Sequence, residues 1–169
     1  EGLPDIQFLF SPQAIAVASE VFWELFETER KRFMKNLECD NSEISFEMFL
    51  SNDTLDSYFL LLEHALMTQR CPAIEEVMLA IEPEYKKFQW DKFISLRYYE
   101  QICYVLNNIS LTHDQKRVLE LQKQKCESQG VHVNTELKEK IWTIKSEIWI
   151  LTQKFMKNLW SARDNTFYY

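Results

Sequence analysis

The chain has 169 residues and a net charge of −7, with 46% hydrophobic and 27% charged residues. A chain of this length can bury about 70% of the surface that its unfolded form exposes, so it needs no metal or disulfide to hold a core. The acidic charge repels phosphate backbones, and we expect no nucleic-acid partner. With only 2 glycines, the chain cannot form the glycine-rich loops that bind nucleotides.

Two helices and a short helical piece are predicted in the first part of the chain. Ser11 and Pro12 have the pattern of an N-cap followed by proline at the first helical position, and the helix is expected to run to about Leu37. A short helical piece is expected around 45–50. The next helix is expected to be capped by Asn52 or Asp53. Apolar residues recur at helical spacing in the two helices: Ile15, Ala18, Phe22, Leu25, Phe26, Phe33 and Leu37, then Leu55, Tyr58, Phe59, Leu62, Leu66 and Met67.

Prolines divide the middle of the chain. Cys71–Pro72 ends one helix and starts another, and Pro83 is expected to interrupt that helix and restart the chain toward Trp90, because proline removes an amide donor and clashes with the preceding turn. A further helix is expected to end at Asn107–Asn108. The apolar residues that mark these two helices are Ile74, Val77, Met78 and Ile81, followed by Phe93, Leu96, Tyr99, Cys103 and Leu106.

The last two helices have clear boundary signals. Thr112 and Gln115 have the spacing of a capping box, and Gly130 is the natural left-handed residue at the end of that helix. Its buried residues are expected among Val118, Leu119, Leu121 and Cys126. Asn134 caps the final helix, which is expected to run to about Arg163.

The final helix is apolar on two sides. One side, the main stripe, consists of Leu137, Ile141, Ile144, Ile148, Leu151, Phe155 and Leu159; the other, the second stripe, consists of Trp142, Trp149, Met156 and Trp160. We expect the main stripe to pack inside the domain and the second stripe to be more exposed. Together with Phe167, Tyr168 and Tyr169, the second stripe is a candidate interface, and an exposed apolar patch of this size favours self-association of the isolated domain.

These elements predict an all-α fold, with residues 1–169 forming a single antiparallel helical bundle of about six to eight helices that ends in one long helix.

No pattern in the chain indicates catalytic residues, a metal site or another cofactor site. The His-Glu-x-x-His and Glu-x-x-His motifs of metal-binding helices are absent, and the titratable thiols and imidazoles are dispersed: Cys39, Cys71, Cys103 and Cys126, with His64, His113 and His132. From the sequence we expect neither a secretory signal nor an apolar run that could span a bilayer. Free thiols without such a signal favour a cytoplasmic protein with no membrane partner.

The C-terminal third carries a family resemblance. Gln129–Val133 followed by Leu137-x-x-x-Ile141-x-x-Ile144-x-x-Glu147-Ile148-x-x-Leu151-Thr152-Gln153-Lys154-Phe155-x-x-Asn158 resembles the end of the N-terminal helical region in the thimet oligopeptidase and oligopeptidase A family of zinc metallopeptidases. Asp164–Thr166, the opening Leu3–Pro4 with Ser11–Ile15, and Ser45–Phe49 are similar to further family segments in the same order. The chain departs from the family pattern at Gln129 (alanine in the family), Ile148 (leucine) and Trp149 (serine).

The resemblance implies a non-catalytic lobe of a larger enzyme. Members of the family are helical ellipsoids with a deep channel, they hydrolyse short peptides, and their zinc motif lies far beyond the region that this chain matches. The chain would then wall the channel, and zinc would be held by a downstream catalytic domain of the same polypeptide. The alternative is a free-standing helical protein-interaction domain. A coding sequence beyond Tyr169 that contains His-Glu-x-x-His would favour the oligopeptidase.

Overall fold

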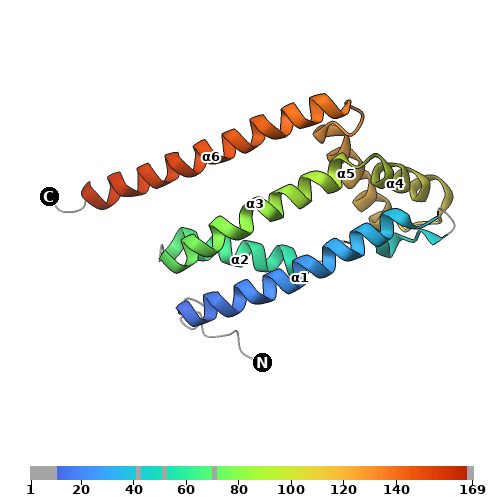
Figure 1. Ribbon diagram of the computed structural model, residues 1–169. Helices are drawn as coiled ribbons and strands as arrows, with labels where there is room; N and C mark the ends of the chain where they lie inside the picture. Colours follow the sequence, from blue (N-terminus) through green and yellow to red (C-terminus); the bar gives the residue numbers. More distant parts are fainter. Residues whose placement is uncertain (1–10, 41–42, 51–52, 70–71, 167–169) are drawn as a thin grey trace. The chain divides into compact units, whose positions relative to one another are not determined.

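The computed structural model describes residues 11–40, 43–50, 53–69 and 72–166, which form helices joined by turns and contain no strand. The predicted all-α class is confirmed. The elements shown in Figure 1 are α1 (Pro12–Glu38), the 3-10 helix η3 (Phe46–Phe49), α2 (Asp53–Gln69), α3 (Pro72–Ile94), α4 (Leu96–Asn108), α5 (His113–Gln129) and α6 (Thr135–Thr166). The chain divides into two compact units, the first ending at Val131 and the second beginning at His132.

Helix α1 begins where its N-cap predicts. The Ser11 hydroxyl oxygen accepts a hydrogen bond from the Ala14 amide at 3.1 Å, and Pro12 is the first helical residue. This bond satisfies one of the amides that a helix start leaves without an intrahelical partner. The N-cap of α2 was predicted to be Asn52 or Asp53, and Asn52 lies outside the described residues.

Aromatic rings from three helices form the centre of the first unit. Phe22 of α1 is completely buried. Its ring centroid lies 6.4 Å from that of Phe59 in α2 and 6.1 Å from that of Tyr85 in α3. One turn further along α1, Phe26 meets Phe88 of α3 edge to face at 5.5 Å. Such aromatic pairs add to the energy of area burial, so α1, α2 and α3 are held together along one shared core.

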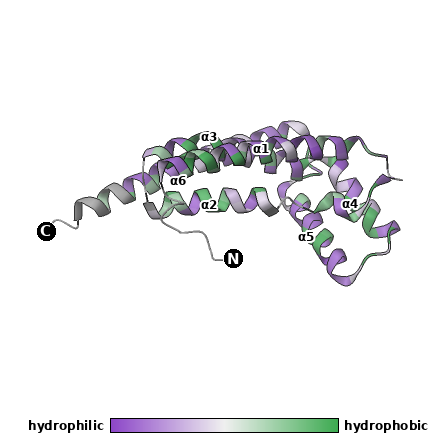
Figure 2. Cartoon of the chain, turned by 90° about the horizontal axis from the view of Figure 1, so that it is seen from below, coloured by the Kyte–Doolittle hydropathy of each residue, from purple (hydrophilic) through white to green (hydrophobic). Residues whose placement is uncertain are grey.

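The polar and apolar residues of α2 and α5 alternate along each helix, as expected for amphipathic helices (Figure 2). In α2 the predicted apolar residues Leu55, Phe59, Leu62 and Leu66 are buried, whereas Met67 is exposed. The side of α2 that contains Phe59 therefore belongs to the core.

The predicted break at Pro83 is wrong, because α3 continues through this proline from Pro72 to Ile94. A proline inside a helix costs about 3 kcal/mol. On either side of it, however, Ile81 and Phe88 are buried, and complete burial of such a side chain contributes about 1.5–3 kcal/mol. Packing of both halves against the core therefore offsets the cost of the proline.

The apolar residues that mark α4 in the sequence are not its most buried ones. Leu96 is exposed and Tyr99, Cys103 and Leu106 are half-buried, whereas Tyr98, Ile102 and Val105 are buried. The hydroxyl of Ser95 caps a new helix by accepting from the Tyr98 amide at 3.3 Å. The chain therefore leaves helical geometry at this serine. The three- and four-residue spacing that starts at Phe93 in α3 cannot be continued into α4.

The turn after α5 has the geometry that Gly130 predicts. Gly130 has φ 86° and ψ 41°, in the left-handed region. Its amide donates to the Glu127 carbonyl at 3.0 Å, and the next amide, of Val131, donates to the Cys126 carbonyl at 3.1 Å. This pair of bonds is the Schellman motif, which satisfies carbonyls at a helix end.

The other two local signals near α5 are confirmed as well. The Thr112 hydroxyl accepts from the Gln115 amide at 3.3 Å while the Gln115 side chain accepts from the Thr112 amide at 2.9 Å, a complete capping box. The Asn134 side chain accepts from the Leu137 amide at 2.9 Å and so caps α6. The two ends of α5 and the start of α6 are therefore defined by residues at most five positions apart.

Candidate functional site

The titratable side chains of the described residues give no sign of a metal site. Within 11–40, 43–50, 53–69 and 72–166 there is no cluster of three or more histidine, cysteine or acidic residues that could hold a metal ion. Cys126 is buried, and this burial raises the pKa of its thiol to about 11. A nucleophilic cysteine requires the thiolate form near neutral pH, so Cys126 is a core residue.

A buried lysine lies at the junction of α1, α3 and α4. Lys92 is 7% exposed, and its ammonium lies 5.7 Å from the ring centroid of Phe93 and 5.6 Å from that of Tyr98. Desolvation lowers the pKa of Lys92, and the nearby carboxylate of Glu29 opposes that shift. Glu29 is itself buried and accepts from the Arg32 guanidinium at 2.8 Å. The lysine is thus balanced by an acidic neighbour and by aromatic faces.

The buried charges belong to a network that fixes η3. Arg32 also donates to the Leu50 carbonyl at 2.6 Å, directly after η3. The Tyr98 hydroxyl donates to the Gln122 side chain at 2.7 Å, and the Gln122 amide donates in turn to the Phe49 carbonyl at 2.9 Å. Buried polar groups of this kind stabilise a fold when they are hydrogen bonded. We therefore assign the network a structural role.

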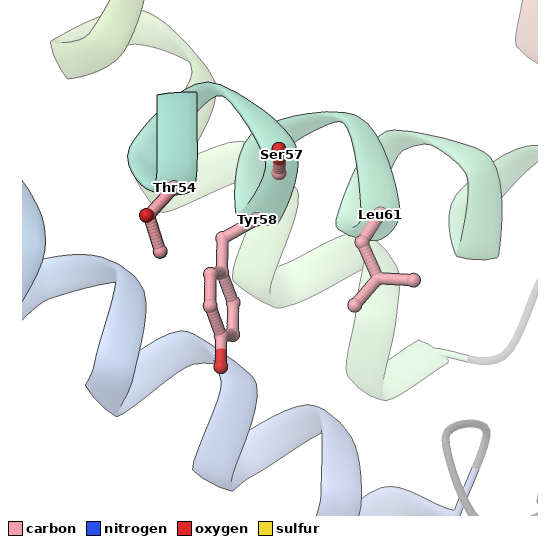
Figure 3. A pocket seen from close by; sticks show the side chains of 4 residues that line it. All are labelled: Thr54, Ser57, Tyr58 and Leu61. Atoms are coloured by element: carbon pink, nitrogen blue, oxygen red, sulfur yellow. The ribbon is translucent and has the colours of Figure 1, made fainter. Parts of the chain in front are cut away.

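In the described part of the chain, two of the surface hollows are each lined by residues of a single helix. The first, of about 310 Å³, is lined by Thr54, Ser57, Tyr58 and Leu61 of α2. Figure 3 shows Tyr58 extending from α2 toward α1, with Thr54 and Leu61 on either side of it. The second, of about 510 Å³, is lined by six residues of α1: Glu27, Arg30, Lys31, Met34, Lys35 and Glu38. Ligand pockets usually enclose most of a small molecule between several elements, so neither hollow is a candidate site.

Helix α6 is the strongest candidate for a functional surface. The second stripe, which we expected to be the more exposed one, is half-buried at Trp142, Trp149 and Met156. The side chain of Trp160 and the residues Phe167, Tyr168 and Tyr169 lie outside the described part of the structure. The role of this stripe and of the C-terminal aromatic residues as an interface stays a prediction.

The main stripe is exposed, so the expectation that it packs inside the domain is wrong. Ile148, Leu151 and Phe155 are 57%, 62% and 63% exposed, and Leu137, Ile144 and Leu159 are exposed as well; Ile141 is half-buried. In the described part of the second unit, α6 is the only helix, so that unit offers no neighbouring element to cover two apolar sides. Hydropathy alone does not predict which of the two apolar sides has the more exposed side chains.

The spacing of the main stripe indicates what it can bind. From Leu137 to Phe155 its residues follow one another at alternate steps of four and three positions. This is the seven-residue repeat by which one helix packs along another. An apolar row of this kind is typical of helix faces that pack against a second helix.

No helix in the described ranges has an apolar stretch of the length needed to cross a membrane. Comparison with known proteins found no match to a protein-family model, to a curated protein or to a solved structure.

Proposed function

We propose that the chain is the non-catalytic N-terminal helical lobe of a zinc-dependent oligopeptidase. In this proposal residues 1–169 are one domain, an antiparallel helical bundle ending in a long helix, and they help to wall the channel that admits short peptides. The partner is the catalytic domain of the same polypeptide. Zinc belongs to that domain, since the described residues of this chain offer no set of metal ligands.

The observation that carries the proposal is the exposed main stripe of α6. Monomeric proteins rarely leave a long contiguous apolar surface uncovered, and α6 exposes Ile144, Ile148, Leu151 and Phe155 over three turns. Much of the family resemblance lies in this same helix. A lobe that is covered by the rest of a larger polypeptide accounts for both features.

The turn before α6 gives a second line of support. The resemblance places a helix end at Gly130 and the start of a long helix shortly after it. The left-handed conformation of Gly130 and the side-chain cap from Asn134 lie at those positions. The backbone thus has the local geometry that the resemblance requires, although long amphipathic helices in unrelated proteins share such caps.

A free-standing helical interaction domain is the second candidate. It is favoured by the same exposed stripe, which would then be covered by a separate protein. The two candidates differ in what the coding sequence contains beyond Tyr169.

The test begins with the downstream coding sequence. We expect a His-Glu-x-x-His motif there, since two histidines one helical turn apart hold zinc while the glutamate activates water. The whole polypeptide should cleave short internally quenched peptides but not casein, and the activity should disappear with a chelator and return with zinc. A matched variant with glutamine in place of the motif glutamate should be inactive. A stop codon directly after Tyr169, or a whole polypeptide without peptidase activity, would contradict the proposal.

A further inference from the structure

The main stripe of α6 is bordered mainly by lysines. In the seven-residue repeat, Ile141, Ile148 and Phe155 share one apolar position, and Leu137, Ile144 and Leu151 share the other. The positions that flank these two rows are Lys138, Lys140, Lys145, Glu147, Thr152 and Lys154. Side chains at these flanking positions form ion pairs with a partner helix and select it. Four lysines against one glutamate make the border of this surface basic.

The basic border is unusual within this chain. Helix α6 contains six Lys or Arg residues and four Asp or Glu residues, so its formal charge is +2. The whole chain has a net charge of −7, and the residues outside α6 therefore total −9. A basic border is complementary to a helix that carries acidic residues on both sides of its apolar row.

A second copy of α6 does not provide that charge. In a parallel pair, Lys140 of one helix would face Lys145 of the other. In an antiparallel pair with Ile144 opposite Ile148, Lys140 of one helix would face Lys154 of the other. Lys145 would face Lys145 of the second copy, and Glu147 would face Glu147 of the second copy. Like charges face each other in both arrangements, which disfavours pairing.

We propose that the main stripe of α6 docks an acidic amphipathic helix, with apolar residues at alternate three- and four-residue steps and Glu or Asp on both borders. The helix belongs to the remainder of the same polypeptide, and this assignment of its source rests on the proposed function.

Three of the four lysines already interact with other groups of the chain, and the proposal does not require any lysine to be unpaired. Lys140 pairs with Glu136 at 2.6 Å, in a contact where both side chains are largely exposed. Lys138 and Lys145 take part in further interactions. Exposed pairs of this kind are weak and exchange readily. The partner is selected by the net positive charge of all the residues that border the main stripe.

The test uses the 169-residue chain and two synthetic peptides. Both peptides have four heptads with Ile and Leu in the apolar positions; one has Glu at every flanking position and the other has Lys. Repulsion between these like charges keeps each peptide from pairing with itself. In calorimetric titrations the Glu peptide should bind about tenfold or more tightly than the Lys peptide, and the ratio should shrink at high salt because the flanking charges are screened.

Variants of α6 provide the matched controls. Ile148→Asp places a charge in the main stripe and should weaken binding of the Glu peptide about tenfold or more. Ile150→Asp makes the same change at a residue that is 45% exposed on another side of the helix, and it should leave binding unchanged. The double variant Lys140→Glu with Lys145→Glu should reduce or invert the preference between the peptides. Circular dichroism verifies that each variant keeps the helical content of the parent chain.

Equal affinity for the two peptides, no binding of the Glu peptide, or equal effects of the two aspartate variants would overturn the docking surface. A dimer in sedimentation that Ile148→Asp dissociates would mean that the occupant is a second copy. The outcomes for the two proposals are separable. Binding of the Glu peptide without a downstream His-Glu-x-x-His motif would reject the oligopeptidase and the source of the helix, whereas a downstream motif without peptide binding would reject only the docking surface.

Discussion

Substitution of Gly130 by alanine tests the turn on which the start of α6 depends. Gly130 has φ 86°, a conformation in which a Cβ atom approaches the following carbonyl and costs an L-residue about 1–2 kcal/mol. Alanine also lowers the conformational entropy of the unfolded chain, which raises the free energy of unfolding by about 0.4–1 kcal/mol. The two hydrogen bonds of the Schellman motif, from the Gly130 and Val131 amides, are kept if the backbone does not move. We therefore expect Gly130→Ala to lower the free energy of unfolding by about 1 kcal/mol.

The measurement is a urea titration followed by circular dichroism, with the slope of the transition compared between variants. Gly130→Asn is the matched control, because asparagine tolerates the left-handed region better than alanine does, and it should cost less than Gly130→Ala. A neutral or stabilising effect of alanine, or a larger loss for asparagine than for alanine, would show that the left-handed conformation does not control this turn.

Three further predictions concern the core, the buried thiol and the absence of a metal site. Phe22→Ala, which removes a completely buried ring, should cost about 3–5 kcal/mol in the same urea titration, whereas Val17→Ala at an exposed position should change stability by less than about 0.5 kcal/mol; similar effects of the two variants would contradict the assigned core. The pKa of Cys126 rises from 9.0 to about 11 in the folded chain, so between these values the unfolded chain loses the thiol proton first and stability falls as pH rises. Relative to Cys126→Ala, the parent chain should thus lose stability over that range, and parallel pH profiles would refute this. Finally, the 169-residue chain should neither retain zinc through dialysis nor cleave peptides; stoichiometric zinc by elemental analysis would identify ligands that the sequence does not indicate.

Local signals of helix boundaries were predictable from the sequence because each depends on atoms within one helical turn. The Ser11 cap, the Thr112–Gln115 capping box, the left-handed Gly130 and the Asn134 cap all lie where the residue pattern places them. A side chain that reaches an amide three positions away does so whatever surrounds the helix. The all-α class follows from the same local information together with apolar residues at helical spacing.

Some predictions that required knowledge of neighbouring elements failed. The sequence pattern alone indicated a break at Pro83, yet the core on both sides of it keeps α3 continuous. The pattern did not identify Tyr98, Ile102 and Val105 as the most buried residues of α4, because the new helix start at Ser95 involves a hydrogen bond that hydropathy does not register. Burial energy depends on the surface that a second element offers, and no local pattern contains that information.

The candidate site shows the same division within a single helix. The sequence by itself determined that α6 has two apolar stripes and that lysines border the main one, because residue spacing on a helix fixes which side chains share a side. Only the tertiary structure decided that Ile148, Leu151 and Phe155 are exposed while Trp142 and Trp149 are half-buried. The physical reason is that residue spacing fixes which side chains share a side of the helix, whereas the exposure of each side chain depends on the atoms that lie around it.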